Sequence, residues 1–103
     1  MKTIMLVCNA GMSTSLLVNK MKAAAAEIEN ETFDIFATPL SGVKNEVEVK
    51  PVDIILVGPQ VRFKLKELKG KYEPEIIVDT INVQDYGMMN GANVLKAALE
   101  KLQ

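Results

Sequence analysis

Residues 4–15 of the chain read IMLVCNAGMSTS, and this stretch decides the fold. Its first four residues are all apolar, which is typical of a strand buried on both faces of a parallel sheet. The small residues and the glycine of 9–11 suit a tight turn. An apolar residue then recurs at helical spacing, which predicts a helix from Ser13. The stripe of that helix consists of Leu17, Met21, Ala24 and Ile28.

Apolar runs and helical patterns alternate along the rest of the chain. Residues 33–37 are predicted to form a half-exposed strand, and residues 54–57 and 76–78 two further buried strands. Residues 44–49 are compatible with a short helix, and residues 79–89 with a loop or a short helix.

Two further helices are predicted in the second half of the chain. One runs from Val61 to Gly70, which is expected to be its C-cap. The other begins at Asn90, an expected N-cap. The apolar face of this last helix consists of Val94, Leu95, Ala98, Leu99 and Leu102.

This element order predicts an α/β fold with an open, four-stranded parallel sheet and helices on both faces. Right-handed crossovers favour the strand order 2-1-3-4, with residues 1–103 forming one domain. Ligands bind such sheets outside the carboxyl ends of the strands, where the strand order reverses. That crevice would be lined by residues 8–15 and 58–61.

Composition excludes several kinds of function. Twelve basic and thirteen acidic residues give a net charge of −1, which argues against a nucleic-acid-binding module. The absence of His excludes a phosphohistidine on this chain, and a single Cys excludes an internal disulfide or a Cys-based zinc site. We expect no metal and no cofactor. Covalent chemistry must therefore use Cys8, a hydroxyl or a carboxylate.

The sequence also bears on location. No apolar run approaches the roughly 18 to 20 residues of a transmembrane helix. The apolar run of residues 4–7 is too short for a signal peptide. Together with the lone cysteine, these features predict a cytoplasmic protein.

Cys8 stands where the first strand ends and the loop begins. A loop of this composition can turn several backbone N–H groups towards an anion, and the start of the helix adds its positive dipole end. The same field favours a thiolate, which is a nucleophile for phosphoryl transfer. The alternative is that Cys8 is a small buried side chain and that the hydroxyls of Ser13, Thr14 and Ser15 only cap the helix.

At this loop the sequence resembles enzyme IIB of the bacterial phosphoenolpyruvate-dependent sugar phosphotransferase system, in the lactose/cellobiose/chitobiose branch. The resemblance continues through residues 53–61 (DIILVGPQV), Tyr86-Gly87 and residues 94–98 (VLKAA). It implies a phosphoryl carrier in which a phosphohistidine on enzyme IIA donates its phosphoryl group to Cys8. Membrane-embedded enzyme IIC would hold the acceptor, a β-linked disaccharide such as cellobiose, lactose or chitobiose.

The resemblance also implies a set of site residues. The loop would bind phosphate mainly through backbone donors of Asn9, Ala10, Gly11, Met12, Ser13, Thr14 and Ser15. Met12 would either stand exposed for docking or fill a gap in the core. Residues of second rank, expected beside the site from loop position alone, are Gln60, Asp79 and Tyr86. The carrier is expected to be monomeric, with IIA and IIC as transient partners at the inner face of the membrane.

The fold implied by this resemblance is like that of low-molecular-weight tyrosine phosphatases, so a phosphatase is the competing interpretation. Those enzymes carry a Cys-x5-Arg pattern and a late Asp general acid. Thr14 occupies the arginine position here, and the one arginine of the chain is Arg62. Asp85 resembles the late acid, although a surface turn is the alternative. Without a bidentate guanidinium, ester hydrolysis loses charge stabilisation, which favours the carrier. A flavodoxin-like nucleotide binder stays open but leaves the cysteine unexplained.

Overall fold

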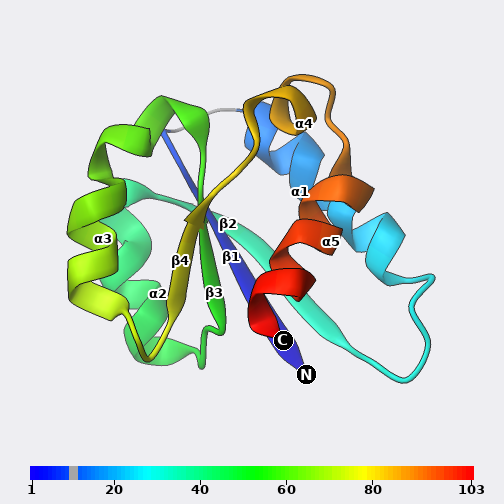
Figure 1. The fold of residues 1–103 in the computed structure, drawn as a ribbon, viewed down its shortest axis with the longest axis horizontal. Coiled ribbons are helices and arrows are strands. Elements are labelled where there is room, and N and C mark those ends of the chain that lie inside the picture. Colours follow the sequence, from blue (N-terminus) through cyan, green and yellow to red (C-terminus); the bar gives the residue numbers. More distant parts are fainter. Residues whose placement is uncertain (10–11) are drawn as a thin grey trace.

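Four parallel strands form one sheet in the order β2-β1-β3-β4, as predicted (Figure 1). The computed structural model describes residues 1–9 and 12–103, and only the backbone of Met12 and Ser13. The strands are β1 (Lys2–Cys8), β2 (Phe33–Pro39), β3 (Ile54–Val57) and β4 (Ile77–Thr80). Because β1 and β3 are consecutive in the sheet but not in the sequence, the strand order reverses between them.

Helices cover both faces of the sheet (Figure 1). The helices on one face are α1 (Met12–Ala25) and α5 (Gly91–Leu102). Those on the other face are α2 (Val43–Val49) and α3 (Leu65–Tyr72). Three short segments complete the structure: α4 (Val83–Gly87) and the 3-10 helices η1 (Leu40–Gly42) and η2 (Pro59–Lys64).

The central strands carry the core on both faces because successive side chains of a strand point to opposite sides. Ile4 and Leu6 of β1 pack in the cluster that contains α1 and α5. Met5 and Val7 pack in the cluster that contains α2 and α3. The continuous apolar run of β1 is therefore explained by two buried faces rather than one.

Several boundaries differ from those predicted. Gly70 is not a C-cap, because α3 continues to Tyr72 and the Glu73 amide donates to the Lys69 carbonyl. Ile28 lies beyond α1, where the amides of Glu27 and Ile28 form tighter i→i−3 bonds that end the helix. Ile28 still packs against the α1 side of the core.

Residues 59–64 and 79–80 also depart from expectation. The segment predicted as a helix from Val61 starts as the 3-10 helix η2, and Val61 itself has a non-helical φ of −119°. Asp79 and Thr80 belong to β4 rather than to a loop. The predicted N-cap at Asn90 is confirmed, because its side chain accepts a 3.0 Å hydrogen bond from the Asn93 amide.

Both termini lie at one end of the sheet, and β1 leaves the sheet at the other end (Figure 1). The carboxyl ends of all four strands share that second end because the strands are parallel. The residues that follow β1 and β3 therefore lie at the edge where the sequence predicts the site.

Helices α1 and α5 approach each other closely at Gly91, the buried first residue of α5. A Cβ atom at Gly91 would lie 2.5 Å from both the Lys20 carbonyl carbon and the Met21 amide nitrogen. Only glycine allows this contact without a backbone shift.

Gly91→Ala is expected to lower the free energy of unfolding by about 1–3 kcal/mol, the usual cost of overpacking. Urea unfolding followed by circular dichroism measures the change. Gly70→Ala is the matched control, because nothing lies within 4 Å of its added Cβ and it sits inside α3. Alanine should stabilise that position slightly. Equal unfolding midpoints for the two variants would show that α1 and α5 are not in close contact.

Candidate active site

Cys8 is the last residue of β1, at the point where the strand order reverses. It is paired in register with Pro39 at the end of β2. On the other side, the Gly58 amide after β3 donates a 2.9 Å hydrogen bond to the Val7 carbonyl. A Cβ at Gly58 would lie 3.1 Å from that same carbonyl oxygen, so the turn after β3 lies directly against β1. Both neighbouring strands thus fix the position of Cys8.

The thiol of Cys8 is covered. The residue exposes 6% of its surface, and Sγ donates a hydrogen bond to the Thr38 carbonyl at 3.8 Å. The sequence predicted a sulfur beside an anion-binding loop, whereas the structure holds the Cys8 sulfur against the end of β2. An attacking sulfur must leave this contact, because a carbonyl oxygen repels a thiolate.

The start of α1 supplies the positive end of a helix dipole close to β1. The helix begins at Met12, four residues after Cys8, and its first turn holds no acidic residue. The first four amides of a helix have no partner within the helix, so they are available to an anion. Ala10 and Gly11 lie outside the described residues, as do the side chains of Met12 and Ser13. The predictions on those atoms stay predictions.

The remaining polar residues of the predicted loop differ in exposure. Asn9 and Ser15 are exposed. Thr14 is buried, and its hydroxyl forms a 3.1 Å hydrogen bond with the hydroxyl of Tyr86 in α4. Thr14 and Tyr86 were both candidates, but the sequence contained no signal for their contact.

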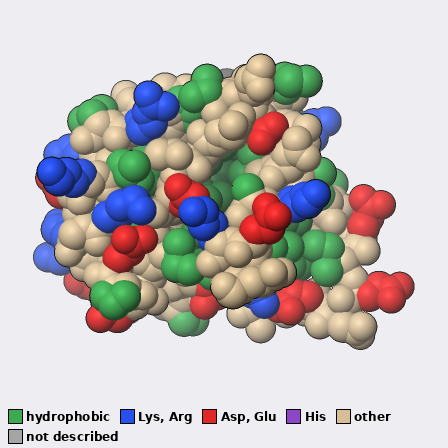
Figure 2. Space-filling model, in the orientation of Figure 1, with side chains coloured by type: hydrophobic (Ala, Val, Ile, Leu, Met, Phe, Trp, Pro, Cys, Tyr) green, Lys and Arg blue, Asp and Glu red, His purple; other side chains and the backbone are tan. Residues whose placement is uncertain are grey.

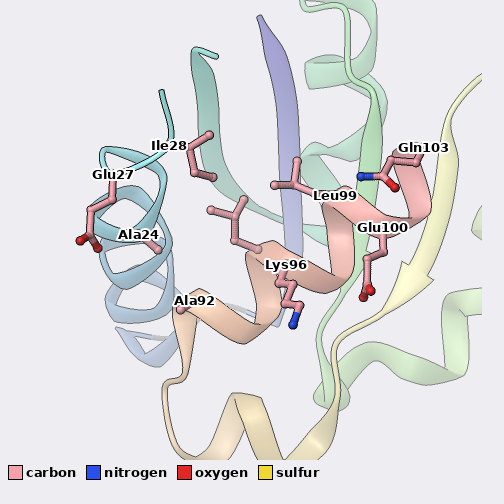
Figure 3. A pocket seen from close by; sticks show the side chains of 9 residues that line it. Ala24, Glu27, Ile28, Ala92, Lys96, Leu99, Glu100 and Gln103 are labelled. Atoms are coloured by element: carbon pink, nitrogen blue, oxygen red, sulfur yellow. The ribbon is translucent and has the colours of Figure 1, made fainter. Parts of the chain in front are cut away.

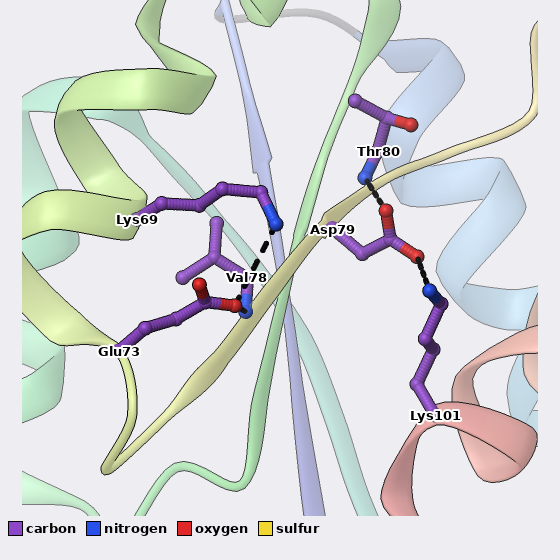
Figure 4. Close-up of polar contacts among 6 residues, drawn as sticks. All are labelled: Lys69, Glu73, Val78, Asp79, Thr80 and Lys101. Carbon is purple, nitrogen blue, oxygen red and sulfur yellow. Dashed lines mark hydrogen bonds and ion pairs between the residues drawn. The ribbon is translucent and has the colours of Figure 1, made fainter.

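The other residues of second rank lie in different places. Gln60 is exposed in η2, and its Oε1 lies 3.5 Å from the position that a Cβ of Gly58 would occupy. Asp79 does not lie in a loop beside Cys8. Its carboxylate, on the edge strand β4, accepts from the Thr80 amide at 2.8 Å and pairs with Lys101 of α5 at 3.7 Å (Figure 4). The structure thus gives Asp79 two partners on the β4 side of the sheet, and its expected role in the site stays a prediction.

Asp85, which resembles a phosphatase general acid by its position, has structural partners. Its amide donates to the Asn82 side chain, and its carboxylate accepts a 3.2 Å hydrogen bond from Asn93 Nδ2. The arginine of the chain, Arg62, is exposed in η2. Thr14 rather than a guanidinium stands six residues after Cys8.

Thr38 is a site residue that sequence reasoning missed. Its contribution is a backbone carbonyl, which any residue type provides, so only the register of β2 on β1 could have revealed it.

A groove of about 540 Å³ lies between the end of α1 and α5 (Figure 3). Its lining includes Ala24 and Ile28 from one side and Leu99 from the other, and Cys8 is not part of it. Within residues 1–9 and 12–103, no three potential metal ligands come together. Among the helices that the structure describes, none is long and apolar enough to cross a bilayer.

Known proteins are similar to this chain in sequence and in architecture. The profile of the family described as "PTS system, Lactose/Cellobiose specific IIB subunit" matches residues 3–97. The chain is 47% identical over 102 residues to the PTS system galactose-specific EIIB component of Lactococcus lactis subsp. cremoris (strain MG1363), covering 94% of this chain and 93% of that one. It is 46% identical over 102 residues to the cellobiose-specific EIIB component of Lactococcus lactis subsp. lactis (strain IL1403), with the same coverage of 94% and 93%.

A solved structure supports the fold. The lactose-specific IIB component domain from Streptococcus pneumoniae superimposes with a TM-score of 0.81, covering 99% of this chain and 98% of that chain at 20% identity. The expected likeness to the low-molecular-weight tyrosine phosphatase fold is confirmed.

An α/β fold with a cysteine at the strand-order reversal, and with threonine rather than arginine six residues later, fits a phosphoryl carrier better than a phosphatase. The chain belongs to the family of lactose/cellobiose-specific IIB subunits of the sugar phosphotransferase system. It is thus a phosphotransferase component of sugar transport, as the sequence predicted, and the phosphatase alternative is not favoured.

Burial predicts that iodoacetamide alkylates Cys8 slowly in the folded protein, because the thiol is covered and donates to Thr38. Mass spectrometry of timed samples measures the rate. The matched control is Asn9→Cys in a Cys8→Ser background, which places a thiol at the adjacent exposed position. This control should react several times faster. Equal rates would contradict the covered conformation.

Proposed function

We propose that Cys8 carries the phosphoryl group between two partners. The observation that supports this most directly is the position of the chain's one cysteine, at the carboxyl end of the central strand and four residues before α1 begins. In this proposal, as the resemblance to the family implies, the donor is a phosphohistidine on enzyme IIA and the acceptor is a sugar bound by enzyme IIC. The absence of histidine from this sequence agrees with a donor on another chain.

The proposed reaction has two displacement steps at phosphorus. In the first, the Cys8 thiolate attacks, an S–P bond forms, the N–P bond of the donor breaks, and its electron pair returns to the imidazole. In the second, a sugar hydroxyl attacks, an O–P bond forms, and the S–P electron pair returns to sulfur. The hydroxyl proton passes to a base on the sugar-binding partner. Such transfers need positioned donors more than covalent chemistry.

Backbone amides of Asn9, Ala10, Gly11, Met12, Ser13, Thr14 and Ser15 are the proposed phosphate ligands. The start of α1 at Met12, with no acidic side chain in its first turn, supports them. In this proposal the sulfur rotates away from the Thr38 carbonyl when a donor docks.

Exposed apolar side chains support docking around this edge. They follow the carboxyl ends of three strands, and Figure 2 shows hydrophobic side chains at the surface on this side of the molecule. Those that follow the carboxyl ends of strands are Leu16, Phe63, Val83 and Met88, whereas Met1 and Val49 are exposed elsewhere. Because one sulfur serves both partners, IIA and IIC would use overlapping faces in turn. Transient contacts of this kind suit a monomeric, single-domain carrier over residues 1–103 that works in the cytoplasm.

The substrate is proposed to be a galactoside or a β-linked disaccharide. The relatives are named for galactose and cellobiose, and the solved structure for lactose. Sugar selectivity is expected to reside mainly in enzyme IIC.

Cys8→Ser is expected to abolish phosphoryl acceptance, because a serine hydroxyl is not ionised near neutral pH. The test follows radiolabel from phosphorylated enzyme IIA to this chain. The control is Asn45→Ser, which introduces a serine at an exposed position of α2 away from Cys8 and should accept the label normally. Circular dichroism checks that both variants fold. Label on Cys8→Ser would rule out this cysteine as the acceptor.

The protein is expected to give no steady turnover of p-nitrophenyl phosphate, because no guanidinium follows Cys8 at the position of Thr14. The absorbance of released p-nitrophenolate measures this turnover, with a low-molecular-weight tyrosine phosphatase as the positive control. Turnover that disappears in Cys8→Ser would instead support a phosphatase.

A further inference from the structure

The contact between Thr14 and Tyr86 joins two parts of the chain that are 72 residues apart. Thr14 exposes 2% of its surface and Tyr86 8%, and their hydroxyl oxygens are 3.1 Å apart. Tyr86 otherwise belongs to the apolar cluster between the sheet and helices α1 and α5. A polar contact is thus built into a core that is mostly hydrocarbon.

The buried hydroxyls contribute little net stability. Desolvating two hydroxyl groups costs roughly what their mutual hydrogen bond returns, so an apolar pair of similar shape would pack as well. What a hydrogen bond adds over an apolar contact is direction. It fixes one side-chain orientation of Thr14, whose hydroxyl would otherwise choose between rotamers.

Tyr86 is itself held firmly. The Asn82 side chain caps α4 by accepting from the Asp85 amide at 3.0 Å. The Asp85 carboxylate and carbonyl accept from Asn93 Nδ2 and from the Asn90 amide, respectively. These bonds join α4 to the start of α5, which in turn lies against α1 at Gly91. Tyr86 is therefore held relative to α5 and α1, and it belongs to the core cluster that includes Leu6 and Leu56 of the sheet.

Thr14 lies in the first turn of α1, six residues after Cys8. A threonine hydroxyl can accept one hydrogen bond and donate another at the same time. Either hydroxyl can be the donor in the contact with Tyr86, and when Tyr86 donates, the Thr14 hydroxyl keeps its own proton for a second acceptor.

We propose that Tyr86 is a positioning residue for phosphoryl transfer, acting through the Thr14 hydroxyl to fix the first turn of α1 beside Cys8. This rests on the proposed function of Cys8 as the phosphoryl acceptor. Tyr86 does not touch the reacting atoms in this proposal. Its effect is on how well the start of α1 is placed when the group arrives.

The test is single-turnover transfer from radiolabelled, phosphorylated enzyme IIA, measured by rapid quench at several donor concentrations. Tyr86→Phe keeps the ring and removes the hydroxyl. We expect the saturating rate to fall about fivefold, the effect of one neutral hydrogen bond, with an unchanged half-saturating donor concentration. Tyr72→Phe, which removes the other tyrosine hydroxyl of the chain on the opposite face of the sheet, should leave both values unchanged.

The dependence on Thr14 separates positioning from general stability. In a Thr14→Ser background, which keeps a hydroxyl, Tyr86→Phe should again lower the saturating rate about fivefold. In a Thr14→Val background it should have no further effect. The ³¹P chemical shift of the phosphorylated protein should change in Tyr86→Phe and not in Tyr72→Phe.

Three results would overturn the inference. They are a Tyr86→Phe rate equal to that of Tyr72→Phe, an undiminished effect in the Thr14→Val background, and a Tyr86→Phe protein that circular dichroism shows to be unfolded in the assay. An unfolded Tyr86→Phe protein would show that the Tyr86 hydroxyl is needed to stabilise the fold rather than to position Thr14. Cys8→Ser in the same assay separates the two proposals. Label on that variant removes the proposed function, whereas an inert Cys8→Ser with an unaffected Tyr86→Phe removes only the inference on Tyr86.

Discussion

Burial of β1 on both faces is the constraint on which the rest of the structure depends. Thr3 to Cys8 are all buried, and hydrogen bonds to β2 and β3 hold both edges of the strand. A shift of β1 by one residue would exchange its side chains between two closely packed core clusters, and the mismatch in shape opposes such a shift. Packing of β1 in the core therefore also fixes the position of Cys8, the last residue of the strand.

Family membership and the missing arginine six residues after Cys8 both favour a carrier over a phosphatase. A phosphatase of this fold needs a guanidinium beside its cysteine. The guanidinium stabilises the transition state in which water attacks phosphorus. This chain has Thr14 at that position and an exposed Arg62 in η2. A carrier gains from the missing charge, because its phosphorylated sulfur must persist until the acceptor arrives.

Much of the fold could be predicted because it depends on local patterns. The apolar runs at residues 4–7 and 54–57 identify the two central strands, and the short connections between elements restrict the strand order. The cap at Asn90 follows from local chemistry alone. Predictions failed where a residue type is compatible with two positions, inside a helix or just beyond its end. Gly70 lies inside α3 instead of ending it, and Ile28 packs on the core from beyond α1.

The site was less predictable, because its contacts link distant residues. The loop after β1 could be identified from its composition, but the cover over Cys8 comes from a backbone carbonyl of β2. Asp79 appeared to be close to the loop until the length of β4 and the ion pair with Lys101 were known. The bond between Thr14 and Tyr86 depends on how α4 packs against α1, which no local pattern records.

The shared location of the two chain ends has a practical consequence for the molecule. Both lie at the edge of the sheet opposite the end of β1 (Figure 1). An affinity handle, a fluorophore or a tethered protein module attached at either end would hang away from Cys8. Surface immobilisation through such a handle would present the thiol-bearing edge outward to any visiting protein.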